Sequence, residues 1–176
     1  MLALYSSGRT TGLVLDSGEG ISSTLPIYEG YAVPHAIQRV PLAGKHLTEY
    51  MRTILEQKGI HLSSATDFDI ARELKEKMCY AAPNYDDSLK ESLETHSSDK
   101  SYDLPDGRKI TLGSERFKVT EAFFNPTIAG YQMEGLPKIC FDSAMRCDVD
   151  VRRELLQNLI LAGGSTLFEG MGERMW

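Results

Sequence analysis

The sequence predicts an α/β fold. Two β-rich runs joined by a glycine-rich turn lie between Tyr5 and Tyr28, a pattern that is typical of a hairpin. Apolar residues at helical spacing follow over residues 42–58 and 66–82. Residues 158–162 form an apolar run that is typical of a buried parallel strand, and a second glycine-rich turn follows it. Strands near both ends with helices between them place the chain in the α/β class.

The composition is that of a globular protein with one ordinary domain or two small ones. The 176 residues are 41% hydrophobic and 25% charged, which matches typical soluble proteins. No apolar run approaches the roughly 20 residues that a membrane helix needs, so no membrane span is expected. The formal net charge of −6 would repel a phosphate backbone, which argues against nucleic acid as the principal partner.

The cysteines and the first residues bear on the cellular compartment. Cys79, Cys140 and Cys147 are odd in number and lack C-x-x-C spacing, which argues against a disulfide framework and against a zinc site. Reduced thiols in the cytosol or nucleus are therefore expected. Residues 1–10 lack a basic region followed by a long apolar core, so no signal peptide is expected. The chain is predicted to enter a strand almost at once.

The turn of the first hairpin has the sequence DSGEG, from Asp16 to Gly20. Its two acids, Asp16 and Glu19, suggest a metal site. Its glycines, Gly18 and Gly20, free the backbone to expose consecutive N–H groups, an arrangement that binds anions such as phosphate. The residue types alone leave both interpretations open.

Two helices are predicted after this hairpin. The first covers residues 42–58, and Gly59 supplies a left-handed stop. The second begins near residue 66, and its core stripe consists of Ile70, Leu74, Met78 and Ala81. Its other flank carries Arg72, Lys75, Glu76 and Cys79. That flank is a candidate site, although a surface ion pair between Arg72 and Glu76 would explain two of its members.

The rest of the chain alternates short elements with turns. Residues 83–100 are polar and acidic with little periodicity, so an irregular exposed segment is expected. A Pro-Asp-Gly turn predicts a second hairpin over residues 102–113. A short helix over residues 114–124 should end before Asn125–Pro126. Asp148 is a candidate cap for a further helix.

The second glycine-rich turn follows the apolar run near the end of the chain. Gly163 and Gly164 are followed by Ser165, and such a turn lets phosphate or ribose approach the backbone closely. The common motifs G-x-x-x-x-G-K-[ST], G-x-G-x-x-G and H-E-x-x-H do not occur in the sequence. The four histidines show no metal-binding spacing.

Several segments together resemble the actin family, which belongs to the ATPase superfamily of sugar kinases, heat-shock chaperones and actin. They are DSGEG at residues 16–20, PIYEGYAVPHAI at 26–37, LAGKHLTEYM at 42–51, IARELKEKMCYAA at 70–82, KSYDLPDGRKITLGSERF at 100–117, MRCDVDVRRELL at 145–156 and LAGGSTLFEGM at 161–171. The resemblance covers essentially the whole chain, but it reaches only the middle-to-late part of actin.

The resemblance implies a partial actin-like ATPase fold, which is ribonuclease-H-like. One half-molecule is expected, with a scaffold portion from residues 1–42 and 132–176 and an inserted, mostly helical lobe from residues 43–131. The first phosphate loop of actin, its metal-holding acid near the N-terminus and the glutamine that positions the attacking water have no counterpart among the 176 residues.

The resemblance also unites the two interpretations of DSGEG in one site for ATP or ADP with Mg²⁺. It implies that Gly18, Glu19 and Gly20 give backbone contacts to the phosphates, and that Asp16 holds Mg²⁺ through water. Gly163, Gly164 and Ser165 resemble the adenosine-binding motif. By the same resemblance Arg72, Lys75 and Glu76 flank the ribose and adenine, and the apolar wall beside the base is formed by Leu167 and Phe168.

Three places depart from the actin pattern. Glu19 stands where actin has aspartate, and the extra methylene moves the carboxylate by about 1.5 Å, enough to disturb the octahedral geometry of hydrated Mg²⁺. Ser23 stands where actin has a histidine near the attacking water. ATP hydrolysis is implied for the full-length family, but efficient hydrolysis by this chain is not expected. Residues 127–131 resemble the apolar plug that actin presents to neighbouring subunits, with differences in detail.

The resemblance implies an actin-like cytoskeletal protein that binds ATP and forms filaments as the full-length protein, with this chain carrying part of the nucleotide site. The implied partners are actin or actin-like subunits, actin-binding proteins and chaperones. The implied location is the cytoplasm and cytoskeleton, or the nucleus for an actin-related protein. Two alternatives stay open: a non-polymerising actin-related scaffold subunit of a larger complex, and a truncated product without independent activity.

Overall fold

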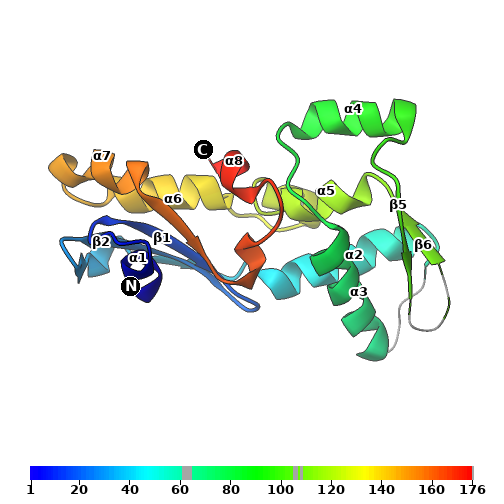
Figure 1. Ribbon diagram of the computed structural model, residues 1–176, viewed down its shortest axis with the longest axis horizontal. Helices are drawn as coiled ribbons and strands as arrows, with labels where there is room; N and C mark the ends of the chain where they lie inside the picture. Colours follow the sequence, from blue (N-terminus) through cyan, green and yellow to red (C-terminus); the bar gives the residue numbers. More distant parts are fainter. Residues whose placement is uncertain (61–64, 105–106, 108, 176) are drawn as a thin grey trace. The chain divides into compact units, whose positions relative to one another are not determined.

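The described residues of the computed structural model form two compact units (Figure 1). The description covers the chain except residues 61–64, 105–106, 108 and 176, and the side chains of residues 65 and 66. The first unit contains Met1–Gly44 and Glu134–Leu167, and the second contains Lys45–Met133 and Phe168–Trp176. Residues 168–176 therefore group with the lobe, whereas the resemblance assigned them to the scaffold portion.

The first unit is built on a five-stranded sheet. Its strands are β1 (Gly12–Ser17), β2 (Ser22–Tyr28), β3 (Tyr31–Ala32), β4 (Gln38–Val40) and β7 (Leu159–Ala162). β1 pairs antiparallel with β2 and parallel with β7, and β2 also pairs with β3 and β4. The predicted hairpin and the predicted parallel strand are confirmed. β7 is half-buried rather than buried, because it ends the strand order of the described sheet.

Helices lie on both faces of this sheet. α6 (Leu136–Met145) and α7 (Val149–Gln157) pack against β1 and β2, and α1 (Leu2–Ser6) packs against β1 and β7. Figure 1 shows α1 on the opposite side of the strands from α6 and α7. Val14 packs with Leu4 of α1, whereas Leu13 and Leu15 point to the other face by strand alternation and are fully buried. The sheet thus carries a core on each side.

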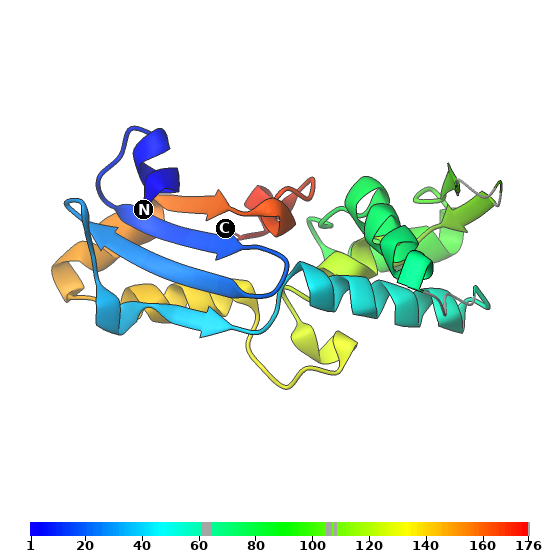
Figure 2. The same ribbon diagram turned by 90° about the horizontal axis from the view of Figure 1, so that it is seen from below.

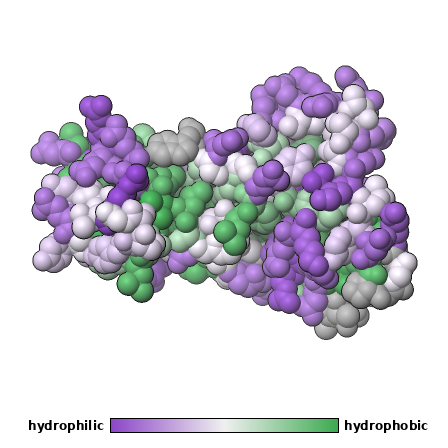
Figure 3. Space-filling view, in the orientation of Figure 1, coloured by the Kyte–Doolittle hydropathy of each residue, from purple (hydrophilic) through white to green (hydrophobic). Residues whose placement is uncertain are grey.

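The second unit is mostly helical. Its helices are α2 (Gly44–Gln57), α3 (Ala65–Met78), α4 (Tyr85–Thr95), α5 (Glu115–Glu121) and α8 (Met171–Met175). The first residue of α2, Gly44, still belongs to the first unit. A hairpin joins β5 (Lys100–Asp103) to β6 (Lys109–Leu112). α5 packs against α3 and α4. Figure 2 shows these helices from below, and Figure 3 shows hydrophilic side chains over α3 and α4.

Most local predictions in the second unit are confirmed. Gly59 ends α2 with a φ of +84°, as the left-handed stop requires. The predicted core stripe of α3, Ile70, Leu74, Met78 and the following Ala81, is buried. The strands of the second hairpin form as predicted, but its Pro-Asp-Gly turn lies partly outside the described residues. The 126–131 segment begins with a 3₁₀ turn, η2 (Pro126–Ala129), and Gly130 is left-handed.

Two predictions of local structure were wrong, and the prediction of a cap at Asp148 was right only in its position. The chain opens with helix α1 rather than a strand, because Leu4 is buried against the sheet. Residues 83–100 are not irregular, because α4 forms there behind an N-cap at Asn84. The Asn84 side chain accepts hydrogen bonds from the backbone N–H groups of Asp86 and Asp87 at 3.1 and 3.4 Å, and both acids favour a first helical turn. Asp148 stands at the N-cap of α7, but its side chain accepts no cap hydrogen bond.

Candidate functional site

The two glycine-rich turns lie at the same edge of the first unit's sheet. β1 and β7 are parallel, and Asp16 pairs with Ala162 in their register. The turn after β1 and the turn after β7, which contains η3 (Gly164–Thr166), therefore leave the sheet side by side. Ligands of open α/β sheets bind beyond the carboxyl ends of the strands. The position of both turns fits a ligand site.

Direct contacts join the two turns. The Oγ of Ser165 donates a hydrogen bond of 2.8 Å to the carbonyl oxygen of Gly18, and Ser165 is buried. Gly163 has a φ of +89°, and a Cβ there would lie 2.3 Å from the carbonyl oxygen of Ser17 and 2.7 Å from Oδ1 of Asp16. No side chain fits in that space. Gly163 is therefore a packing requirement of the joined turns.

Other glycines of the turns leave open space instead. A Cβ at Gly18, Gly20 or Gly164 would have no atom within 4 Å. The N–H of Gly18 is engaged, since it donates to the carbonyl oxygen of Ile21 at 3.2 Å. Among the described hydrogen bonds, none uses the N–H of Glu19 or Gly20. In this first turn, the described N–H groups that can still donate to an anion include those of Glu19 and Gly20.

Gly44, the first residue of α2, completes the site and was not predicted from the sequence. Its N–H donates to the carbonyl oxygen of Gly18 at 2.9 Å. A Cβ at Gly44 would lie 2.7 Å from Oγ of Ser165 and 2.8 Å from Oε2 of Glu19. The Glu19 carboxylate thus lies beside the start of α2. The available signal was a glycine at the start of a strong helical pattern.

A buried chain of hydroxyl groups supports the same turn. The Oγ atoms of Ser17 and Ser22 are 2.7 Å apart, and Ser22 donates to the carbonyl oxygen of Leu42. Because a hydroxyl has a single proton, Ser17 is the donor to Ser22. Both serines are fully buried. Their bonds tie the closing pair of the β1–β2 hairpin to the segment that leads into α2, a link that no sequence pattern indicated.

The acids of the turn face solvent. Asp16 and Glu19 are exposed, and Ser23 is half-buried opposite Asp16 in the β1–β2 register. Within the described residues, no group of three or more His, Cys, Asp or Glu side chains could hold a metal ion. Mg²⁺ typically takes one or two carboxylates and keeps several waters. A single carboxylate such as Asp16 fits that mode of binding.

Comparison with protein families agrees with this geometry. A family model described as Actin matches residues 1–69 and 61–176, so that the matches together span the chain. The chain belongs to the actin family. The resemblance found in the sequence and the partial actin-like fold are thereby confirmed. Members of this family generally bind ATP or ADP with Mg²⁺. None of the helices in the described part of the chain has the length and apolar character needed to cross a bilayer.

The remaining residues that the actin resemblance assigned to the nucleotide belong to the second unit, except Leu167. Arg72 and Glu76 are exposed on α3, while Lys75 is buried. Arg72 pairs with Asp69 at 2.9 Å, so the alternative ion pair between Arg72 and Glu76 was wrong. The Phe168 ring lies 6.4 Å from that of Phe123. These residues stay predictions of the actin resemblance.

Leu167 and Cys79 differ in character from the rest of the predicted set. Leu167 is 83% exposed, so an apolar side chain faces solvent beside the second turn. Cys79 is buried, and burial raises the pKa of its thiol to about 12. A thiol with such a pKa is protonated and unreactive at neutral pH. Cys79 is a packing residue directly after α3.

Proposed function

We propose that the joined turns are the second phosphate loop and the adenosine turn of an actin-family site for ATP or ADP with Mg²⁺. The observation that carries the proposal is the hydrogen bond from Ser165 to the carbonyl oxygen of Gly18, because it joins two open glycine-rich backbones at one sheet edge. Donors at such an edge bind the oxygens of a phosphate chain.

Each residue of the turns has a distinct part in this proposal. The backbone N–H groups of Glu19 and Gly20 donate to phosphate oxygens, while the N–H of Gly18 closes the turn on Ile21. Asp16 orients waters of the Mg²⁺ ion. Gly164, whose Cβ position is open, lets the nucleoside approach the backbone. Bound Mg²⁺ supplies charge neutralisation at the phosphates, which favours attack of water on the γ-phosphate.

The wider role follows from the family. We propose that the full-length protein forms ATP-dependent filaments in the cytoskeleton, with actin or actin-like subunits and actin-binding proteins as partners. Glu19 favours a second candidate, a non-polymerising scaffold subunit that holds nucleotide without turnover. Its longer side chain lies beside Gly44, and Ser23 opposite Asp16 has no imidazole to offer to an attacking water. Phosphate release from bound ATP distinguishes the two candidates.

The test is the binding of Mg²⁺–ATP to the chain and to Asp16→Asn. Loss of the carboxylate should weaken binding by about tenfold in the presence of Mg²⁺ and should have little effect in its absence. Asp148→Asn is a matched control, because Asp148 is another exposed aspartate of the first unit whose side chain makes no cap bond. Equal weakening by both substitutions, or an Mg²⁺-independent effect of Asp16→Asn, would contradict the proposal.

A further inference from the structure

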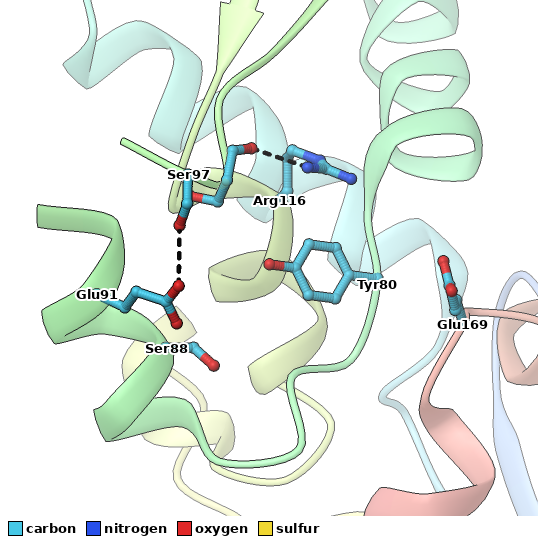
Figure 4. A pocket seen from close by; sticks show the side chains of 7 residues that line it. Tyr80, Ser88, Glu91, Ser97, Arg116 and Glu169 are labelled. Carbon is cyan, nitrogen blue, oxygen red and sulfur yellow. Dashed lines mark hydrogen bonds between the residues drawn. The ribbon is translucent and has the colours of Figure 1, made fainter. Parts of the chain in front are cut away.

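A hollow of about 430 Å³ lies within the second unit. Its walls come from α4, the segment after α4, α5, the segment after α3 and the segment before α8 (Figure 4). The lining residues are Tyr80, Ser88, Glu91, Ser97, Ser98, Arg116 and Glu169. All seven side chains carry a charge or a hydroxyl group, and Tyr80 adds an aromatic ring. The hollow is therefore polar with one aromatic surface.

Backbone hydrogen bonds fix the aromatic wall in place. The N–H of Tyr80 donates to the carbonyl oxygen of Arg116, and Thr120 Oγ1 donates to the carbonyl oxygen of Tyr80 at 2.6 Å. The N–H of Ala81 donates to the carbonyl oxygen of Glu169 at 2.8 Å. Tyr80 also packs against Phe117, with ring centroids 5.9 Å apart. The wall is rigid because α5 and the segment before α8 hold it from two sides.

Arg116, the one cation among the described residues that line the hollow, already forms hydrogen bonds with the protein. Arg116 donates from Nε to the carbonyl oxygen of Met78 at 2.7 Å and from Nη1 to that of Ser98 at 2.8 Å. Its guanidinium lies 4.9 Å from the centre of the Tyr80 ring. Within the described residues Arg116 forms no ion pair with a carboxylate. Its role is to hold the segment after α4 against the ring.

The two carboxylates of the hollow, those of Glu91 and Glu169, are not held by strong bonds to the protein as Arg116 is. Glu91 accepts a long hydrogen bond of 3.3 Å from Ser97 Oγ, and Figure 4 shows the carboxylate between Ser88 and Ser97. Glu169 presents its side chain from the other side of the backbone at Tyr80 (Figure 4). Neither forms an ion pair with a described residue. Burial raises the pKa of Tyr80, Arg116 lowers it, and both Glu91 and Glu169 raise it further, so both carboxylates act on the same phenol.

We propose that this hollow binds a cationic nitrogen group, either an ammonium or a guanidinium. The lining has two carboxylates against one guanidinium that the protein itself uses, so its net charge is negative and an anion is disfavoured. Carboxylate and hydroxyl oxygens accept the N–H bonds of such a cation, whereas the Tyr80 ring already faces the guanidinium of Arg116. The cation comes either from a free polyamine or from a basic side chain of a partner polypeptide.

Two probes distinguish these sources: spermidine, and the peptide acetyl-Gly-Arg-Gly-amide. The chain is attached to a sensor surface at low density, which keeps the copies apart, and each probe is passed over it. We expect saturable binding of at least one probe. Glu91→Gln and Glu169→Gln should each weaken it by about three- to tenfold, as for partly exposed charge pairs. Both side chains are exposed, so the fold should tolerate the changes.

Glu94→Gln is the matched control. Glu94 lies on α4 like Glu91 and is exposed, but it does not line the hollow. The change lowers the chain's negative charge by the same amount, so it measures non-specific attraction of cations to an acidic protein. The proposal is overturned by the absence of saturable binding of both probes, or by equal weakening from Glu94→Gln and Glu91→Gln. Preference for the peptide identifies a polypeptide partner, and preference for spermidine identifies a free amine.

Discussion

Ser165 and Gly18 are 147 residues apart in the chain, yet the Ser165 hydroxyl holds the Gly18 carbonyl oxygen at 2.8 Å. The same carbonyl oxygen also accepts the N–H of Gly44 at 2.9 Å. One backbone atom therefore connects the turn after β1, the turn after β7 and the start of α2. In the proposed site, Ser165 positions the phosphate loop and does not itself need to touch the nucleotide.

Ser165→Ala should loosen the turn after β1. The substitution removes one of the two bonds to the Gly18 carbonyl oxygen, at a cost of about 1 kcal/mol in the free energy of unfolding. Amide hydrogen exchange at Glu19 and Gly20 should accelerate, and Mg²⁺–ATP affinity should fall. Ser165→Thr keeps the hydroxyl and should restore both properties. If exchange in the turn is unchanged while ATP affinity falls, Ser165 contacts the ligand directly and the positioning role is wrong.

The glycines of the two turns should separate into two classes on substitution. Gly163→Ala should lower the free energy of unfolding by at least about 2 kcal/mol, because a left-handed φ and a 2.3 Å approach to the Ser17 carbonyl oxygen both oppose a side chain. Gly20→Ala should change stability by no more than about 1 kcal/mol, since its Cβ position is open. Urea unfolding followed by circular dichroism measures both effects.

The Gly20→Ala variant also tests the ligand site. The methyl group of Gly20→Ala enters the space in which phosphate oxygens would lie, so Mg²⁺–ATP affinity should fall by about tenfold although the fold is retained. A variant that folds and binds as well as the original chain would show that the open space at Gly20 is not a phosphate cradle. Gly59→Ala is a further control, because Gly59 ends α2 and belongs to neither turn.

The sequence predicted the elements whose causes are local. The β1–β2 hairpin follows from its glycine-rich turn, and Gly59 marks the end of α2. α4 was missed although its cap is local, because the acidic composition outweighed the capping signal of Asn84 before Asp86 and Asp87. The link between Ser165 and Gly18 was beyond any local pattern, because the parallel pairing of β1 with β7 brings those residues together.

The sequence predicted some of the glycines of the candidate site but not the role of each one. Glycines at 18, 20 and 163 are visible in the sequence as turn residues, but only their surroundings show that Gly163 is enclosed and Gly20 is open. Gly44 was not predicted as a site residue, because a glycine in a helical pattern usually indicates only a residue of low helix propensity. A glycine is required at this position because the side chains of Ser165 and Glu19, which come from other segments, leave no room for a Cβ.

Glu115 should make the stability of the second unit sensitive to acid. Burial alone would raise the pKa of its carboxyl, but hydrogen bonds from the N–H groups of Gly113 and Glu115 and from Lys58 outweigh burial, so the pKa lies below its ordinary value. A lowered folded-state pKa means that the unfolded chain binds the proton more readily. The stabilisation is therefore present above the ordinary pKa of 4.5 and is lost as the pH falls through the folded-state pKa.

The variant Glu115→Gln isolates this contribution. At neutral pH it should be less stable than the original chain by about 1 kcal/mol, and the difference should shrink as the pH falls below the ordinary glutamate pKa. Unfolding by urea at a series of pH values measures the difference. Glu94→Gln, on an exposed helix face, should show no comparable convergence. A difference that stays constant with pH would mean that packing, not ionisation, explains the effect.

Arg72 has two candidate roles, a surface ion pair with Asp69 and the contact with the nucleotide that the actin resemblance implies. In the structure it pairs with Asp69 at 2.9 Å, and both side chains are exposed, so their ion pair contributes only about 0.3–0.5 kcal/mol to stability. Arg72→Ala and Asp69→Asn remove the same pair and should have equally small effects on unfolding. Their effects on nucleotide binding should differ. If Arg72 flanks the ribose and adenine, Arg72→Ala weakens Mg²⁺–ATP binding by about three- to tenfold, whereas Asp69→Asn frees the guanidinium and leaves affinity unchanged or higher. Calorimetric titration of both variants measures the difference. Equal affinities in the two variants would assign Arg72 to the surface ion pair alone.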